Sequence, residues 1–289
     1  MISKSIVLFL TFIFTIQWAD AQVIEPGYES PLDGVYMKSI DTPHKKPIPY
    51  VKLREADIMW AQRVWRVVDM REKMNHVFYY PLKPSQGRKN MMYIIMESIE
   101  LERITAYSPL KADSVSPSDM FDIPLTAFEA KSQLTRKETV TKYDEYGDPY
   151  DTVIVEDIPL EDIKRFKIKE EVFFDKQRST METRILGIAP QYEFYREGEF
   201  LGYRDAFWVY FPEARTVFAE FEVYNRHNDS HRLTYDDVFW KRMFSSYIIK
   251  VSNVYDRSID RYKSPMDALY EAQEMEDDIR NREHDLWSF

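Results

Sequence analysis

The chain has 289 residues, 44% of them hydrophobic and 15% aromatic, which predicts a folded protein with a sizeable core in one or two domains. Its 49 acidic and 39 basic residues give a formal net charge of −10, which argues against a nucleic-acid partner because phosphate backbones need a positive surface. The absence of cysteine excludes disulfides, thiolate metal sites, a cysteine nucleophile and a lipid-modified cysteine.

Residues 1–21 have the features of a secretory signal peptide. Lys4 supplies a short basic region, Ile6 to Ile16 form an apolar stretch too short to span a bilayer, and Ala19-Asp20-Ala21 fit a small-residue cleavage site. We therefore expect an exported chain that begins at Gln22. No later segment reaches transmembrane-helix length, so any membrane association should come through partners.

Residues 22–52 are predicted to form an extended Pro-rich arm, because prolines interrupt the segment and no periodicity is sustained. Residues 53–126 are predicted to be a helical region. From Leu53 to Met74, apolar residues that include Trp60, Val64 and Val68 recur at helical spacing. A second helix is predicted from about Asn90 to Glu102, with an apolar face made of Met92, Ile95, Met96 and Ile99.

The stretch from Lys46 to Pro81 concentrates prolines, aromatic residues and charge, and it reads as a surface for protein partners. Its helical stripe is expected to pack on the protein's own fold, whereas Trp65 falls off the centre of that stripe. Amphipathic aromatic side chains are enriched at protein interfaces. The candidate partner-binding residues are Pro47, Pro49, Tyr50, Trp65, Phe78, Tyr79 and Tyr80.

Residues 127–163 are polar and are predicted to be a linker-like segment, followed at 164–262 by an antiparallel sheet covered by a helix. Four short runs rich in β-branched and aromatic residues are the expected strands, namely Phe166–Phe174, Met181–Ile188, Ala206–Phe211 and Thr216–Tyr224. The covering helix is predicted to start with Thr234 at the N-cap and Asp237 at N3. Its sheet-facing side should comprise Trp240, Phe244, Tyr247, Ile248 and Val251.

Residues 263–289 are predicted to form an acidic C-terminal helix that starts at Ser264-Pro265, with Ala268, Ala272, Met275 and Ile279 on a narrow apolar stripe. The predicted fold class is therefore α+β. It combines a helical N-terminal half with a small antiparallel sheet of about four strands covered by a helix, and adds an extended N-terminal arm and a C-terminal acidic helix.

Motifs for catalysis are absent from the sequence. It contains no H-E-x-x-H, no G-x-S-x-G and no Gly-rich phosphate loop. His227 and His231 have the spacing of a metal pair, but they lie in a polar loop where helical geometry is not expected. We predict no catalytic, cofactor-binding or metal-binding residues. The alternative is a periplasmic hydrolase that uses Asp and Glu residues far apart in the chain.

Four segments follow the signal peptide in a fixed order: PIPYVKLREADIMWAQRVWRVVDMREKMN, FFDKQRSTMETRILGIAP, FWVYFPEAR and DDVFWKRMFSSYIIKVSNVYDR. This ordered set resembles the GldN family of gliding-motility proteins, also called PorN. The resemblance extends roughly from Pro47 to Tyr262 and so covers most of the chain after the signal peptide.

The resemblance implies a periplasmic component of the type IX secretion system of Bacteroidetes, held at the inner face of the outer membrane by a lipoprotein partner. Family members assemble with that lipoprotein, GldK or PorK, into a ring of many copies. The ring contacts the periplasmic part of the inner-membrane motor protein GldM or PorM. The family brings no enzymatic activity and no cofactor with it.

Overall fold

The computed structural model describes residues 45–85, 87–111, 116–143, 149–196, 199–226, 228 and 230–286. They all belong to one compact unit, Thr42–Phe289. The predicted signal peptide at 1–21 and the arm as far as residue 44 lie outside the described residues. Residues 45–54 have no regular secondary structure. The domain boundaries drawn from the sequence remain predictions.

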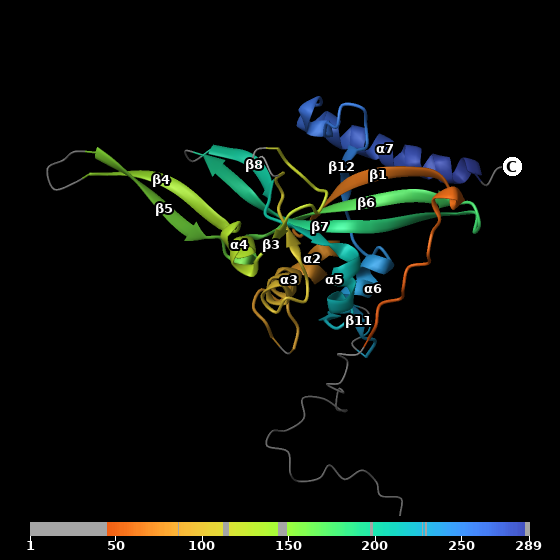
Figure 1. Ribbon diagram of the computed structural model, residues 1–289, viewed down its shortest axis with the longest axis horizontal. Coiled ribbons are helices and arrows are strands. Elements are labelled where there is room, and N and C mark those ends of the chain that lie inside the picture. Colours follow the sequence, from red (N-terminus) through yellow and green to blue (C-terminus); the bar gives the residue numbers. More distant parts are fainter. Residues whose placement is uncertain are drawn as a thin grey trace, which may run out of the picture. The chain divides into compact units, whose positions relative to one another are not determined.

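An eight-stranded antiparallel sheet dominates the fold, with strand order β12-β1-β6-β7-β9-β2-β3 and with β8 paired to β7 (Figure 1). Its long strands β1, β6 and β7 lie next to one another and carry most of the pairing. The strands are β1 (Ile58–Asp69), β2 (Ala106–Tyr107), β3 (Pro124–Leu125), β6 (Arg165–Asp175), β7 (Thr180–Arg196), β8 (Glu199–Asp205), β9 (Trp208–Tyr210) and β12 (Tyr247–Val251).

The predicted helix from Leu53 to Met74 is wrong, because this segment forms β1 in the interior of the sheet. β1 pairs antiparallel with β6 over its length and with β12 on its other side. Every residue from Val64 to Val68 is buried, and the neighbours Val64 and Trp65 belong to different apolar clusters. A strand covered on both faces buries consecutive residues, and the apolar ones among them can match a helical spacing as well.

The main core lies where α2 (His76–Tyr79), α3 (Met91–Glu100), α5 (Phe211–Phe218) and α6 (Tyr235–Trp240) pack against the sheet. Figure 1 shows these helices on one side of β1, β6 and β7 and the C-terminal helix on the other. The predicted helix at 90–102 is confirmed as α3. The Asn90 side chain caps it by accepting a hydrogen bond from the Tyr93 amide, and the four predicted apolar residues are buried.

Two of the four predicted C-terminal strands are confirmed as β6 and β7, and Ala206–Phe211 contains β9. Thr216–Tyr224 is not a strand, because α5 continues to Phe218 and only β10 (Glu222–Val223) follows, paired with β11 (Leu233–Thr234). A proline in the first turn and buried residues at helical spacing account for α5.

The predicted start of the covering helix is confirmed, since Thr234 and Asp237 form a capping box at the N-terminus of α6. Its predicted continuation to Val251 is wrong. The helix ends at Trp240, and Arg242 has a positive φ of 51° that stops further helical turns. The β-branched residues after Tyr247 then form β12 at the edge of the sheet.

Residues 127–163, predicted to be a linker-like segment, contain α4 (Ala127–Ser132) and a separate two-stranded sheet. Its strands are β4 (Thr135–Tyr143) and β5 (Pro149–Asp157), paired from Thr135 opposite Asp157 to Tyr143 opposite Pro149 (Figure 1). Short 3-10 turns occupy Glu55–Asp57, Lys73–Asn75, Leu160–Asp162 and Ile259–Arg261.

The C-terminal helix is present as α7 (Pro265–Leu286). Its predicted stripe of Ala268, Ala272, Met275 and Ile279 packs with sheet residues that include Val64 and Val172. None of the helices in the described part of the chain has both the length and the apolarity needed to cross a membrane. The fold is α+β with a dominant eight-stranded antiparallel sheet and a C-terminal helix. The expected helical N-terminal half with a four-stranded sheet is wrong.

Candidate partner-binding surfaces

The Pro-rich lead-in to β1 ends at Tyr50, which docks on the chain's own fold. Pro49 is exposed and Pro47 is half-buried. The Tyr50 ring lies 4.4 Å from the Arg215 guanidinium, 4.9 Å from that of Arg184, and 5.6 Å from the Trp240 ring. Burial raises the pKa of the Tyr50 hydroxyl. Cation–π and ring contacts therefore hold the end of the lead-in at α5 and α6.

Beneath Tyr50 lies a buried ion pair between α5 and α6. The Arg215 Nε donates to Oδ1 of Asp236 at 2.7 Å and Nη2 donates to Oδ2 at 3.2 Å, and both side chains are more than nine-tenths buried. A cavity of about 170 Å³ adjoins the pair, between Tyr50 and Trp240. Two-point hydrogen bonding fixes the guanidinium plane, so this pair positions the surface on which Tyr50 rests.

Trp65 is 6% exposed and belongs to the core, not to an outer surface. Its Nε1 donates to Oδ2 of Asp119 at 2.6 Å, and the Lys169 Nζ lies 3.2 Å from Oδ1 of the same carboxylate. Burial would raise the pKa of Asp119, but the Lys169 charge and the Trp65 hydrogen bond outweigh it and the pKa is lowered. As placed, Trp65 offers no free surface to a partner.

The three aromatic residues at the end of the Lys46–Pro81 segment differ in their burial. Phe78 is 1% exposed and stacks on Phe239 in the main core, at a ring distance of 5.0 Å. Tyr79 is half-buried and its hydroxyl donates to the Glu161 carbonyl oxygen at 2.9 Å. Tyr80, by contrast, is 52% exposed and lines a groove of about 620 Å³. The structure thus scatters the predicted residues and leaves Tyr80 the most available of the aromatic ones.

A charged network that sequence reasoning missed joins β1, β6, α7 and the end of α6. Glu170 is fully buried, and the Arg242 guanidinium donates to both of its oxygens, at 2.9 and 3.1 Å. The Arg66 Nε lies 3.2 Å from Glu170, and its Nη1 lies 3.5 Å from Glu276 of α7. These four residues carry no shared spacing that could have revealed the network in the sequence.

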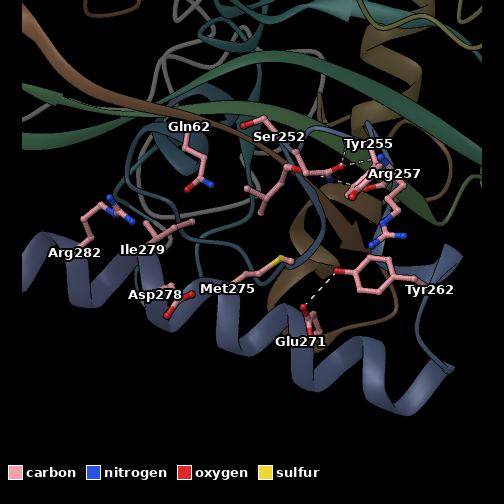
Figure 2. Close-up of a pocket in the computed structure, with 12 residues that line it drawn as sticks. Gln62, Ser252, Tyr255, Arg257, Tyr262, Glu271, Met275, Asp278, Ile279 and Arg282 are labelled. Carbon is pink, nitrogen blue, oxygen red and sulfur yellow. Dashed lines mark hydrogen bonds between the residues drawn. The ribbon is translucent and has the colours of Figure 1, made fainter.

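A cavity of about 490 Å³ separates part of α7 from β1 and the loop at 252–257. Figure 2 shows α7 side chains facing Gln62 and this loop, with the Tyr262 hydroxyl directed at Glu271. That hydrogen bond is 3.4 Å long, and the Arg282 guanidinium lies 4.9 Å from the Trp60 ring. Near its N-terminus α7 leaves Met266, Leu269 and Tyr270 more than half exposed. The helix therefore has apolar surface available for another protein.

The described residues contain no group of three or more His, Asp or Glu side chains that could hold a metal ion. The His227–His231 pair is not tested, because His227 lies outside the described residues. Where a carboxyl pKa shifts in the described chain it falls, at Asp69, Asp119, Glu129 and Asp237. A general acid at neutral pH needs the opposite shift, so these carboxylates serve as ion-pair and capping groups.

In a further cavity, of about 980 Å³, the Asp205 carboxylate is also held in place. Asp205 there accepts from the Lys167 Nζ at 3.0 Å and from the Gln191 Nε2 at 2.7 Å. Both carboxylate oxygens are engaged, which leaves neither free to activate a water molecule. This geometry fits a structural role better than an acid–base one.

Comparison with protein families gives one finding that covers most of the chain. Residues 53–288 match the family model described as gliding motility associated protein GldN. The match runs from just before β1 to the end of α7 and so includes the whole eight-stranded sheet. No curated protein matches the chain.

Proposed function

Since the chain belongs to the GldN family of gliding motility associated proteins, we propose that it is a non-enzymatic structural and interaction subunit of the type IX secretion and gliding machinery. It acts in the periplasm, at the inner face of the outer membrane. There it forms a ring from further copies of itself and an outer-membrane lipoprotein of the GldK or PorK type, and the ring contacts a GldM or PorM type motor protein.

The observation that carries this proposal is the family match over 53–288. The character of the molecule supports it. Exposed apolar side chains on α7 offer a contact surface, as do the paired backbones of β4 and β5, whereas the carboxylates of Asp205 and Glu271 are engaged with a cation and a hydroxyl group. An isolated two-stranded sheet is marginally stable in water, so a partner that covers or extends β4–β5 would stabilise it.

Deleting the gene cleanly in its host tests the function. We expect loss of type IX export and of gliding, with both restored by the wild-type chain, and we expect the lipoprotein to co-purify with the chain from membranes. Normal export in the deletion strain, with no second copy of the gene present, would refute the proposal. A crosslinked pull-down from envelopes would then identify which segment meets which partner.

The alternative of a periplasmic hydrolase acting through dispersed Asp and Glu residues gains no support from a specific observation. It requires two facing carboxyl groups in a cleft, one with a raised pKa. Asp205 and Glu271, which line two of the described cavities, are engaged with the Lys167 ammonium and the Tyr262 hydroxyl group.

A further inference from the structure

The groove beside Tyr80 differs in charge from the rest of the molecule. Its walls come from the end of α2, from the bend where Ser85 and Arg88 exchange backbone hydrogen bonds of 2.9 and 3.0 Å, and from the chain that follows β10. We name it the Tyr80–Tyr224 groove, and its polar and aromatic lining includes Lys73, His76, Tyr80, Arg88, Tyr224 and Arg226.

Every ionisable group other than tyrosine in this lining is basic or histidine, although the chain as a whole has a net charge of −10. None of the described residues that line the groove is Asp or Glu. Glu222, on the adjacent strand β10, pairs with Arg232 at 3.0 Å. Within the described chain, Lys73, Arg88 and Arg226 form no ion pair, so the groove concentrates positive charge that the described residues do not neutralise.

The cations are held in place without being neutralised. The Arg88 guanidinium lies 5.4 Å from the Tyr224 ring centroid, and the Arg226 Nη2 donates to the carbonyl oxygen of Lys73. Tyr80 packs edge-on against His76 at 5.7 Å and remains 52% exposed, and Tyr224 is 49% exposed. Part of the ordering cost of binding is therefore already met before any ligand arrives.

Exposed tyrosine beside arginine is the composition of binding hot spots between proteins. Guanidinium groups bind carboxylates through short charge-assisted hydrogen bonds. Val77 and Pro81 add apolar lining, which suits a side chain better than a lone phosphate or a lipid headgroup. A volume of about 620 Å³ also accommodates several side chains at once.

We propose that the Tyr80–Tyr224 groove binds an acidic peptide segment of a protein partner. Carboxylates of that segment pair with Arg88, Arg226 and Lys73, and an apolar or aromatic side chain lies between Tyr80 and Tyr224. The inference rests on the proposed function in taking a protein as the occupant, and it adds the chemistry of the segment that is recognised.

The test uses the purified full-length exported chain and a fluorescein-labelled peptide of alternating Glu and Tyr. The control peptide is the same sequence with Gln in place of every Glu. We expect saturable binding of the Glu peptide, measured by fluorescence anisotropy, weakening as salt is raised. The Gln peptide should bind at least about tenfold more weakly, since each charge-assisted hydrogen bond exceeds the free energy of a tenfold change.

Two variants with equal charge change separate the groove from general electrostatics. Arg88→Gln with Arg226→Gln removes two groove cations, whereas Lys131→Gln with Lys176→Gln removes two exposed cations elsewhere. We expect about a tenfold loss or more for the first pair and less than about twofold for the second. Circular dichroism and thermal unfolding check that both variants fold, and Tyr80→Ala provides an independent uncharged probe of the same groove.

Equal affinity for the Glu and Gln peptides, or equal effects of the two double variants, would overturn the proposal. So would binding of anionic phosphatidylglycerol vesicles, but not of the peptide, in an Arg88- and Arg226-dependent manner. A change of oligomeric state in Arg88→Gln/Arg226→Gln without peptide binding would assign the groove to a second copy of the chain instead. Because these measurements need no cell, normal export in the deletion strain would refute the proposed function while leaving this result standing.

Discussion

The indole Nε1 of Trp65 donates a 2.6 Å hydrogen bond to Oδ2 of Asp119, a residue 54 positions further along the chain. The same carboxylate meets Lys169 of β6, whose side chain is only 4% exposed. The contact ties a long loop to two neighbouring strands of the sheet. It also explains why an aromatic residue that resembles an interface anchor in the sequence is a core residue in the fold.

Asp119→Asn should lower the free energy of unfolding by about 2 kcal/mol or more, because it leaves the buried Lys169 ammonium without its counter-charge. The matched control is Asp256→Asn, since Asp256 pairs with Lys250 but is 83% exposed. It should change stability by less than about 0.5 kcal/mol. Urea unfolding followed by tryptophan fluorescence measures both, and similar losses would contradict the importance given to burial.

Stability should fall as the pH drops below about 4. The pKa values of Asp69, Asp119 and Asp237 are lowered in the folded chain, where bonds and charges from Arg71, Lys169 and Lys45 outweigh their partial burial. A lowered folded-state pKa adds stability above the unfolded pKa and loses it as the pH falls through the folded value. Melting temperatures at decreasing pH test this, and Asp119→Asn should show a shallower decline than the wild type.

Arg215→Ala should destabilise the protein by about 3 to 5 kcal/mol, because it leaves Asp236 buried and unpaired between α5 and α6. The double variant Arg215→Met with Asp236→Leu should recover most of that loss, since an apolar pair of similar size carries no desolvation cost. Denaturant unfolding of the single and double variants measures the coupling. A double variant as unstable as Arg215→Ala would show that the charge pair itself is needed.

Tyr50→Ala should release the lead-in from α5 and α6, because the Arg215 and Arg184 guanidinium groups then lose the ring between them. Hydrogen exchange of residues 45–54 should rise, and the global stability should fall by about 1 to 2 kcal/mol. Tyr50→Phe keeps the ring and should stay near the wild type. The control is Val51→Ala, at a neighbouring residue that is 49% exposed. If hydrogen exchange of residues 45–54 rises equally in the Val51→Ala variant, Tyr50 does not dock the lead-in.

Truncation of Gln22 to Ile40 should weaken assembly with the lipoprotein partner while leaving the sheet folded. The expectation follows from the Pro-rich composition of the arm, which suits it to wrapping a neighbouring protein. Co-purification from envelopes measures the complex, and circular dichroism with thermal unfolding measures the fold. An unchanged yield of complex would eliminate the arm as a binding element.

What the sequence predicted correctly lies in features that neighbouring residues decide. The capped start of α6 depends on Thr234 and on Asp237 three positions later, and α3 was predicted from the apolar face of its own residues. The helix at Pro265 depends on a proline that suits a first turn. The β-branched and aromatic run at 166–174 likewise favours a strand before any partner is known. These preferences arise between residues that are close in sequence, so the folded structure retains them.

The tertiary structure decided everything that depends on distant pairing. Leu53–Met74 fits a helical stripe and a doubly buried strand alike, and only the flanking strands β6 and β12 make β1 the better solution for its backbone hydrogen bonds. Trp65 is a core residue because folding brings Asp119 and Lys169 beside it, and Asp119 accepts the hydrogen bond of its indole Nε1. Tyr80 lies at the surface and lines one groove together with the cations Lys73, Arg88 and Arg226. Such surfaces are assembled by long-range packing, which no spacing within a segment records.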